Sequence, residues 1–445
     1  MSKVDEKTGI ADLRNRAKAV FIGSIGNLVE WYDFYAYAAF ALYFAHHFFP
    51  GDDPVVQQLN AAVLFALGFI VRPIGAVLFG HIADHHGRRL ALTLSVALMC
   101  FGSLLIAVAP TYDVAGAWAP ALLLGARILQ GLSLGGEYGA SATYLSEVAH
   151  PKHRGFFSSF QYVTLIGGQL CALLVLLVLQ QFFLTKEELM DWGWRIPFVI
   201  GALLAVVAAV MRRNLQETEF FEQLRNTAMK SGIKSSSRNA SSIRALRRHW
   251  REVGLVVGLT MGGTVAFYTY TTYMQKYLKL TVNLTDVQTT LVTAGSLLFA
   301  MLLQPLYGAL SDRIGRRPLL VGFGIAGTIC TIPLLTALQS ASTPWQAFLF
   351  LAFAWVIVSG YTSINAIVKA ELFPTAVRAT GVAVPYAITV SLFGGSAESV
   401  ALWFKSIGYE RGFYYYLTAC IATSLIVYLF MRDTRDQSAL DRATS

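Results

Sequence analysis

Residues 80–89 read Gly-His-Ile-Ala-Asp-His-His-Gly-Arg-Arg, and residues 308–317 read Gly-Ala-Leu-Ser-Asp-Arg-Ile-Gly-Arg-Arg. The two segments share a glycine, an aspartate four residues later and a Gly-Arg-Arg ending, at an offset of 228 residues (308 against 80). A second pair recurs at nearly this offset, because residues 147–154 and 371–378 each begin with Glu and end with Arg. Two motifs at nearly one offset are hard to obtain by chance. The chain is therefore predicted to consist of two related halves.

The chain is also too apolar for a water-soluble domain. Of its 445 residues, 55% are hydrophobic and only 14% are charged, whereas soluble domains average about 25% charged residues. Each helical crossing of a bilayer needs about 20 mostly apolar residues. Twelve such runs are found at 19–45, 57–80, 90–110, 117–146, 156–181, 193–211, 253–275, 288–310, 318–338, 346–368, 380–402 and 411–431. We therefore predict an all-α integral membrane protein with twelve transmembrane helices in two six-helix halves.

Basic residues are unevenly distributed among the segments that connect these runs. With the N-terminus inside, the outer loops hold only Lys186, Arg195, Lys276, Lys279, Lys405 and Arg411. This is the positive-inside pattern, and it explains the net charge of +9 without a nucleic-acid partner. We expect cytoplasmic segments at 1–18, 212–252 and 432–445, an N-terminal half at 19–211 and a C-terminal half at 253–431.

No cofactor, metal or catalytic motif is expected. The cysteines lie inside apolar runs, and their spacing is not that of a metal site or a disulfide framework. No Walker loop, His-Glu-x-x-His motif or nucleophile elbow is present, which disfavours a membrane enzyme. No appended soluble domain is found through which a non-transporting sensor would signal. The chain is expected to act as a monomer.

The duplicated loops lie on the basic, inner side of the predicted topology. Glycine permits tight turns, and an aspartate at a helix end pairs with arginines or caps a helix N-terminus. Such contacts would hold the halves together at the inner surface. The predicted cytoplasmic gate consists of Gly80, Asp84, Gly87, Arg88, Glu147, Arg154, Asp312, Gly315, Arg316, Glu371 and Arg378. The alternative is that the arginines serve only as topology anchors.

Further motifs lie inside the spans. Residues 26–35 read Gly-Asn-Leu-Val-Glu-Trp-Tyr-Asp-Phe-Tyr, residues 72–75 read Arg-Pro-Ile-Gly, and residues 127–138 read Arg-Ile-Leu-Gln-Gly-Leu-Ser-Leu-Gly-Gly-Glu-Tyr. Residues 192–198 read Trp-Gly-Trp-Arg-Ile-Pro-Phe. With the duplicated loop, these motifs resemble the major facilitator superfamily and, within it, the metabolite:proton symporters. The resemblance covers about residues 20–430 and implies transport by alternating access.

Three stretches, at 159–169, 267–277 and 394–398, are similar to the bacterial α-ketoglutarate permeases. This resemblance implies a dicarboxylate substrate and a location in a bacterial inner membrane. One departure from the family pattern is His85, which stands where the first loop usually has Arg or Lys. It would weaken this copy of the gate or make it sensitive to pH.

Five charged residues lie inside spans of the first half. A charge at the centre of a span costs roughly 2.5–3.5 kcal/mol on insertion scales, so it pairs or faces a wet cavity. At ~1.5 Å per residue, Asp33 lies ~21 Å and Arg127 ~28 Å from the inner surface. Glu30, Arg72 and Glu137 lie near ~15 Å. We expect an Asp33–Arg127 pair near mid-membrane that takes part in transport. The alternative is a static ion pair that only fixes helix packing.

These charges predict a proton switch. Arg127 would bind either Asp33 or a carboxylate of the substrate, and Asp33 would take up a proton in the second case. In the related sugar–proton symporters, the matching acid and arginine of helices 1 and 4 are thought to couple protons. Proton coupling is assigned to Asp33, Glu30 and Glu137. A uniporter or an exchanger without protons is the alternative.

A dicarboxylate needs two cationic anchors, and Arg72 and Arg127 are the only basic residues predicted deep in the spans. The predicted substrate-binding residues are Arg72, Arg127, Gln161, Thr164, Gln169, Tyr268, Thr271, Thr272, Gln275, Tyr361 and Asn365. Lys369 is expected to be an anchor at the inner end of its helix. The expected partners are therefore a small organic anion, protons and the lipid bilayer. Citrate, shikimate, proline and betaine remain alternative substrates, although two arginines favour an anion over a zwitterion.

The membrane potential sets the expected number of protons. A dianion entering alone against 100 mV, inside negative, would face about 4.6 kcal/mol. Two protons cancel this cost, so at least two are expected for each dianion that is concentrated.

Overall fold

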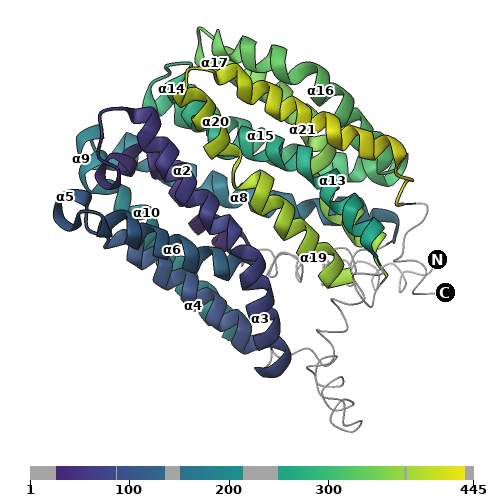
Figure 1. The fold of residues 1–445 in the computed structure, drawn as a ribbon, viewed down its shortest axis with the longest axis horizontal. Helices are drawn as coiled ribbons and strands as arrows, with labels where there is room; N and C mark the ends of the chain where they lie inside the picture. Colours follow the sequence, from purple (N-terminus) through teal and green to yellow (C-terminus); the bar gives the residue numbers. More distant parts are fainter. Residues whose placement is uncertain (1–26, 87, 136–150, 214–248, 375–377, 436–445) are drawn as a thin grey trace, which may run out of the picture.

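The computed structural model describes residues 27–86, 88–135, 151–213, 249–374 and 378–435, and within these ranges the chain is helical, without strands (Figure 1). Described helices fall in each of the twelve predicted runs. Eight of them are long and apolar enough to cross a membrane, and two shorter apolar helices lie at Thr93–Ala107 and Gly193–Val207. The predicted all-α membrane fold is confirmed.

The N-terminal half starts with a helix at residues 27–48. Its other elements are α2 (Pro54–Ile70), α3 (Arg72–His86), α4 (Arg88–Ala107), α5 (Tyr112–Ala115), α6 (Trp118–Gly135), η1 (Pro151–His153), α8 (Arg154–Val178), η2 (Leu179–Phe183), α9 (Lys186–Asp191), η3 (Gly193–Arg195) and α10 (Ile196–Arg213). The helix starts at the outer ends follow local capping rules. Asp53 caps α2, which begins with proline, and Thr185 forms a capping box with Glu188 on α9.

The C-terminal half repeats the pattern with several interrupted spans. Its elements are α13 (Trp250–Tyr268), η4 (Thr269–Tyr273), α14 (Met274–Leu280), α15 (Asp286–Ile314), α16 (Arg317–Gln339), α17 (Pro344–Thr362), α18 (Asn365–Leu372), α19 (Arg378–Thr389), η5 (Val390–Gly394), α20 (Ala397–Ser406) and α21 (Glu410–Phe430). The elements η4 and η5 are π-helical turns. Such turns inside α-helices are frequent at functional sites, and these two continue directly into α14 and towards α20.

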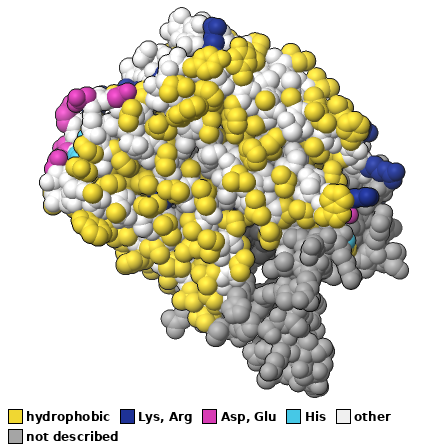
Figure 2. All heavy atoms as spheres, in the orientation of Figure 1, with side chains coloured by type: hydrophobic (Ala, Val, Ile, Leu, Met, Phe, Trp, Pro, Cys, Tyr) yellow, Lys and Arg dark blue, Asp and Glu magenta, His cyan; other side chains and the backbone are white. Residues whose placement is uncertain are grey.

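The outer surface of the described helices is largely apolar (Figure 2). Val77 and Leu306, for example, are each 64% exposed. A water-soluble monomer rarely exposes such large apolar areas. Charged side chains are sparse on this surface and gather towards its edges (Figure 2). The chain is therefore a multi-pass membrane protein.

The two halves meet along pairs of helices from each half. Helix α8 packs against α15, and α2 packs against α20. Gly155 of α8 and Gly308 of α15 permit the first contact, since a Cβ atom on Gly308 would lie 2.6 Å from the Gly155 carbonyl oxygen. Within the N-terminal half, Gly131 of α6 lies still closer to α2, since a Cβ atom on Gly131 would lie 2.0 Å from the Gly68 carbonyl oxygen.

Gly308 lies inside α15, within the predicted run 288–310, and its small size permits the close packing against α8. One sequence-based placement needs correction. Lys276 was assigned to an outer loop but lies in α14 and is buried. The predicted run stopped at residue 275 because the next residue, Lys276, is charged, whereas the helix continues because Lys276 finds buried partners. Residues 1–26, 214–248 and 436–445 lie outside the described residues, so the predicted terminal segments and linker stay predictions.

Candidate functional site

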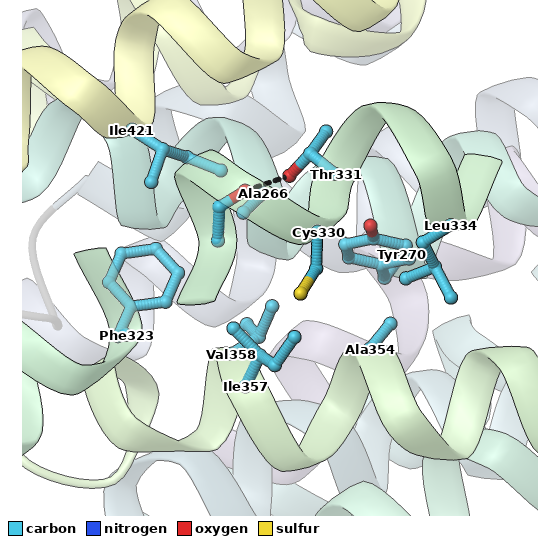
Figure 3. Close-up of a pocket in the computed structure, with 11 residues that line it drawn as sticks. Ala266, Tyr270, Phe323, Cys330, Thr331, Leu334, Ala354, Ile357, Val358 and Ile421 are labelled. Atoms are coloured by element: carbon cyan, nitrogen blue, oxygen red, sulfur yellow. Dashed lines mark hydrogen bonds between the residues drawn. The ribbon is translucent and has the colours of Figure 1, made fainter. Parts of the chain in front are cut away.

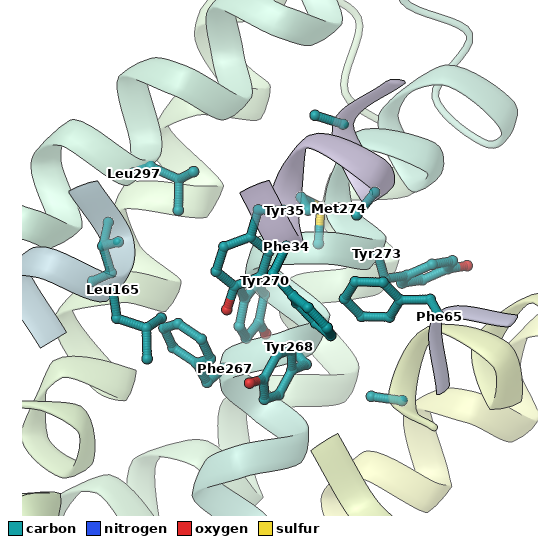
Figure 4. Close-up of a cluster of buried hydrophobic side chains, with 14 of the residues drawn as sticks. Phe34, Tyr35, Phe65, Leu165, Phe267, Tyr268, Tyr270, Tyr273, Met274 and Leu297 are labelled. Atoms are coloured by element: carbon teal, nitrogen blue, oxygen red, sulfur yellow. The ribbon is translucent and has the colours of Figure 1, made fainter. Parts of the chain in front are cut away.

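Aromatic side chains from both halves meet in the interior of the molecule (Figure 4). Phe34 and Tyr35 come from the helix at 27–48, and Tyr268 and Tyr270 come from α13 and η4. All four are buried. Phe69 of α2 makes an edge contact with Tyr268, with 5.2 Å between the ring centroids. The charged residues of the predicted site lie around this aromatic contact between the halves.

Asp33 is buried and held by hydrogen-bond donors from two other helices. Ser103 of α4 donates its hydroxyl to one carboxylate oxygen. The Gln130 amide of α6 donates to the other oxygen at 2.7 Å and to the Ser103 hydroxyl at 3.0 Å. Gly201 of α10 leaves the room that this carboxylate occupies, since a Cβ there would lie 2.3 Å from its oxygen.

Arg127 does not pair directly with Asp33, contrary to the expected ion pair. Its Nη1 donates to Gln130 Oε1 at 2.6 Å, and Gln130 in turn donates to Asp33. The amide therefore connects the two charges as a bridge. Gln130 lies three residues after Arg127 in the motif at 127–138, but the sequence did not show which of the two would reach Asp33.

The remainder of the Arg127 guanidinium lies among aromatic rings. Its carbon is 4.2 Å from the Phe34 centroid, 4.4 Å from that of Tyr37 and 5.1 Å from that of Phe65. Among the described residues, its buried Nε and Nη2 atoms have no hydrogen-bond partner. Cation–π attraction compensates the charge in part, but two N–H groups remain available to a ligand.

Arg72, at the start of α3, has a similar environment. It is buried, and its guanidinium carbon lies 5.2 Å from the Trp31 ring and 5.1 Å from the Phe69 ring. Within the described part of the chain, its buried Nε and Nη1 atoms also lack a hydrogen-bond partner. Both predicted anchors are therefore buried cations with donors to spare.

Polar side chains of the first helix contact several neighbouring helices. Asn27 donates to the Thr164 hydroxyl of α8 at 2.7 Å, and Tyr37 donates to the Ala61 carbonyl oxygen of α2 at 3.0 Å. Glu30 is buried as predicted. Asn27, Asp33 and Tyr37 thus bond to different helices. Glu137 lies outside the described residues.

The other predicted lining residues are all buried: Gln161, Thr164, Gln169, Tyr268, Thr271, Thr272, Gln275, Tyr361 and Asn365. Several of these side chains form hydrogen bonds within the protein. Thr271 and Thr272 donate to carbonyl oxygens of their own helix at 2.8 Å. Tyr361 donates to the Thr260 carbonyl oxygen at 3.4 Å, and Asn365 donates across the interface to the Tyr162 hydroxyl at 2.7 Å. A substrate would have to displace such contacts.

Sequence reasoning missed a buried ion pair in the C-terminal half. Lys276 of α14 pairs with Glu398 of α20, and both side chains are almost fully buried. Lys276 also donates to the Ala38 carbonyl oxygen of the N-terminal half at 3.2 Å, and Gln275 donates to the next carbonyl, of Ala39, at 3.1 Å. An acid inside the apolar run 380–402 was the available signal. Contrary to the expectation, Arg72 and Arg127 are thus not the only deeply placed basic residues.

The pair belongs to a larger set of charges. Arg127 interacts electrostatically with an acid of its own half, Asp33, and with an acid of the other half, Glu398. Lys369 of α18 is also fully buried, and its Nζ lies 3.5 Å from the Tyr386 ring centroid. It was expected to be an anchor at the inner end of its helix, where an exposed position would have been typical.

The second copy of the duplicated loop connects the halves at the end that is predicted to be the inner one. Asp312, in the last turn of α15, accepts hydrogen bonds from the Gly155 and Phe156 amides at the start of α8, at 2.8 and 3.0 Å. Arg316 donates to Asp312 at 2.8 Å and to Glu371 at 3.4 Å. Glu371 also interacts electrostatically with Arg154 of the other half.

The end of this loop is stabilised by residues that follow the last span. Gly315 has φ of +97°, a left-handed conformation that glycine adopts readily, and a Cβ there would lie 2.4 Å from Asp433. Asp433 accepts from the Arg316 and Arg317 amides at 3.2 and 3.0 Å, and Thr434 donates to Glu371 at 2.6 Å.

The remaining gate residues are only partly described. Arg378 is buried and donates to carbonyl oxygens at the end of α18. Gly80 and Asp84 lie in α3 and Arg88 begins α4, but their side chains, and that of His85, lie outside what the structure describes. Gly87 and Glu147 lie outside the described residues altogether.

A small cavity lies inside the C-terminal half (Figure 3). It is lined by apolar residues such as Phe323 and Ile421, with Cys330 and Thr331, and no charged residue lines it. Thr331 bonds to its own helix at 2.6 Å. A volume of about 10 Å³ is near the minimum for one water molecule, so this cavity is not a substrate site.

Known proteins resemble this chain over nearly its whole length. The sequence profile described as "Sugar (and other) transporter" matches residues 19–441. The α-ketoglutarate permease of Escherichia coli (strain K12) is 52% identical over 430 residues, which cover 96% of each chain. A glycine betaine/proline/ectoine/pipecolic acid transporter of Dickeya dadantii (strain 3937) is 31% identical, over 98% of this chain and 86% of its own. The crystal structure of a D-xylose-proton symporter superimposes with a TM-score of 0.71 at 18% identity, over 94% of this chain and 99% of its own.

Proposed function

Because the chain belongs to the family of sugar and other transporters and has the fold of the major facilitator superfamily, we propose that it is a proton-coupled symporter that imports α-ketoglutarate or a closely related dicarboxylate. The family resemblance inferred from the span motifs is confirmed by these matches. The choice of substrate follows the relative that shares 52% of its residues.

One observation carries the choice of an anion. Arg72 and Arg127 are buried in the interior, among aromatic rings, with guanidinium N–H groups that no described residue accepts. A buried cation without full compensation is costly, and a carboxylate is the group that matches a guanidinium fork. A substrate with two carboxylates compensates two such cations.

The bridge between Asp33 and Arg127 supplies a route for proton coupling. Arg127 Nη1 donates to Gln130 Oε1, and this bond orients the Gln130 amide so that the amide nitrogen donates to Asp33. When a substrate carboxylate binds Arg127, Arg127 no longer orients the Gln130 amide. Asp33 then loses a hydrogen-bond donor that stabilises its charge. Asp33 then takes up a proton, which travels with the substrate. Glu30 and Glu137 are proposed to share in this proton path.

Alternating access would use the contacts at the two ends of the interface. The bonds of Asp312 to α8 close the inner end, and the bonds of Gln275 and Lys276 to the first helix close the outer end. Both sets are present together, so this arrangement corresponds to a closed intermediate. We place both termini in the cytoplasm, the protein in a bacterial inner membrane, and one chain in the functional unit.

The test is uptake of radiolabelled α-ketoglutarate into proteoliposomes at two pH values, with and without a protonophore. Uptake that rises with outside acidity and collapses with the protonophore is expected. Competition by citrate, shikimate, proline and betaine determines the substrate class. Competition by proline or betaine alone would replace the dicarboxylate with a zwitterion, the substrate class named for several relatives that are 30–33% identical.

The transported charge is a second readout of the same experiment. With two or more protons for each dianion, uptake moves zero or net positive charge inwards. Inward movement of net negative charge during concentrative uptake would refute the proposed stoichiometry.

A further inference from the structure

We propose that Lys276 and Glu398 form a second proton-coupling pair, in the C-terminal half, in which Lys276 binds a carboxylate of the substrate and Glu398 takes up the accompanying proton. The inference rests on the proposed symport function and deepens it, because it assigns the second proton to a named acid. It also gives each half one acid and at least one cation at the site.

The geometry of the pair is that of an exchangeable contact. Lys276 and Glu398 are 1% and 2% exposed, and they form an ion pair through one glutamate oxygen. The other oxygen, Oε2, is buried and no described residue donates a well-formed hydrogen bond to it, because the nearby Thr272 hydroxyl donates to the Tyr268 carbonyl oxygen at 2.8 Å. A carboxylate that is fully committed to structure normally satisfies both oxygens. Glu398 therefore has an incomplete set of partners as a charged group.

Structural stability does not explain a pair at this position. In many buried ion pairs, the free energy needed to desolvate the two charges exceeds their electrostatic attraction. Replacement of such a pair by apolar residues is therefore often neutral or stabilising. The same half contains ordinary ion pairs nearer the outer surface, Lys279 with Asp286 and Lys405 with Glu410, whose side chains are 15–30% exposed. Lys276 and Glu398 differ from these pairs in being almost fully withdrawn from water.

The pair adjoins the site of the N-terminal half. The charged and titratable groups that face Glu398 are Lys276 of α14, Arg127 of α6, Tyr37 of the first helix and Tyr273 of η4. Tyr37 also contacts Arg127, with its ring centroid 4.4 Å from the guanidinium carbon. Hydrogen bonds therefore connect Asp33, Gln130 and Arg127, and an electrostatic interaction across the interface between the halves connects Arg127 to the Glu398–Lys276 pair.

The exchange step balances in charge and atoms. A substrate carboxylate replaces Glu398 at the Lys276 ammonium, and the displaced glutamate binds one proton from the outer aqueous phase. After the inner end opens, the substrate leaves, Glu398 releases its proton to the cytoplasm, and the ion pair forms again. With a second proton on Asp33, one dianion and two protons cross, and no net charge moves.

The same contact connects binding to closure of the outer end. The Lys276 ammonium donates to the Ala38 carbonyl oxygen of the first helix, while the substrate would be held by Arg127 and Arg72 of the N-terminal half. Lys276 reaches this position only when α14 packs against the first helix. A substrate held by cations of both halves thus favours the closed arrangement, because binding energy is available only there.

The experiment compares wild type with Glu398→Gln in proteoliposomes at zero membrane potential. A pH-sensitive dye and radiolabelled α-ketoglutarate give the ratio of proton flux to substrate flux, corrected for proton leak without substrate. We expect a ratio of two in wild type and one in the variant. For an imposed gradient of one pH unit, the limiting accumulation falls from about 100-fold to about tenfold, since each proton contributes a factor of about ten.

Lys276→Gln tests the anchor, and Lys279→Gln on the same helix is the matched control. We expect the KM for α-ketoglutarate to rise about tenfold or more in Lys276→Gln, as loss of a charged hydrogen bond implies. Lys276→Arg should restore much of it, whereas the control should leave KM unchanged. If the Lys276–Glu398 pair served only as a gate, Glu398→Gln would alter the transport rate but leave the ratio of proton flux to substrate flux at two.

If a single variant fails to fold, the double variant Lys276→Met with Glu398→Met removes both charges together. It should fold, transport with a raised KM and give a flux ratio of one. A ratio of two in Glu398→Gln or in the double variant would overturn the inference and leave the proposed symport intact. A wild-type ratio of zero would instead overturn the proposed function itself.

Discussion

The inner contact between the halves makes a quantitative prediction for Asp312→Asn. The Asp312 carboxylate accepts the Gly155 and Phe156 amides of the other half and the Arg316 guanidinium of its own. An asparagine has one acceptor oxygen where the carboxylate has two. Its amide nitrogen would face a backbone N–H, so one bond across the interface is lost.

The magnitude follows from the kind of bond that is removed. A hydrogen bond to a charged group contributes about 1.5–3 kcal/mol, and we take about 2 kcal/mol for the lost bond. The bond exists only while the inner end is closed, so its loss shifts the equilibrium towards the inward-open state by about 30-fold.

The assay measures the accessibility of a cysteine in the inner part of the interface. Ser159 of α8 is fully buried and lies against Gly308 of α15. Ser159→Cys, in a variant without the native cysteines, should react with a membrane-impermeant maleimide added from the cytoplasmic side. The labelling rate is proportional to the open population, so Asp312→Asn should raise it by about 30-fold.

Asp286→Asn is the matched control, because it makes the same chemical change at the opposite end of α15. Asp286 pairs with Lys279 at 2.5 Å and with Lys186 of the other half at 3.1 Å. Its loss weakens the outer contact and should not increase labelling of the inner cysteine. Unchanged labelling in Asp312→Asn, or an equal rise in both variants, would refute the assignment of Asp312 to the inner gate.

Three further outcomes are expected. Asp33→Asn should abolish proton-driven accumulation while exchange of internal for external substrate continues. The control Asp113→Asn, at an exposed residue of α5, should change neither. Accumulation that persists in Asp33→Asn would exclude Asp33 from the proton path. Arg127→Lys keeps the charge but loses the planar fork, so the KM for α-ketoglutarate should rise about tenfold or more, and an unchanged KM would argue against direct binding. Gly131→Ala places a methyl group against the α2 backbone and should cost about 1–3 kcal/mol, seen as a lower Tm, whereas Gly125→Ala in the same helix has open space and should not.

The spans were predictable because the bilayer imposes a simple requirement on sequence. About 20 apolar residues are needed for each crossing, and that pattern can be counted without knowledge of the fold. The wrong end predicted for the seventh span has the same physical origin. The charged Lys276 is typical of a loop, so the span was predicted to end at residue 275. The helix instead continues to Leu280, because Gln275 and Lys276 bond to the first helix and Lys276 also pairs with Glu398.

The candidate site was predictable only in part. The buried charges on the first and fourth helices were evident in the sequence, because insertion of a charge within an apolar span costs free energy and such charges are rare without a role. Which group would touch which was not evident. Asp33 was expected to contact Arg127, yet Gln130 stands between them, and residues three apart on one helix face are equivalent until the position of the neighbouring helix is known.

A membrane protein of two related halves, with charges within its spans, could be predicted from the amino-acid sequence alone. The partners of these charges became known from the packing of the helices. Lys276 meets Glu398, and Asp312 meets the start of α8, across long separations in the chain. Apolarity and charge are properties of each residue and its neighbours in sequence. Pairing depends on how helices pack, and that is a property of the folded chain.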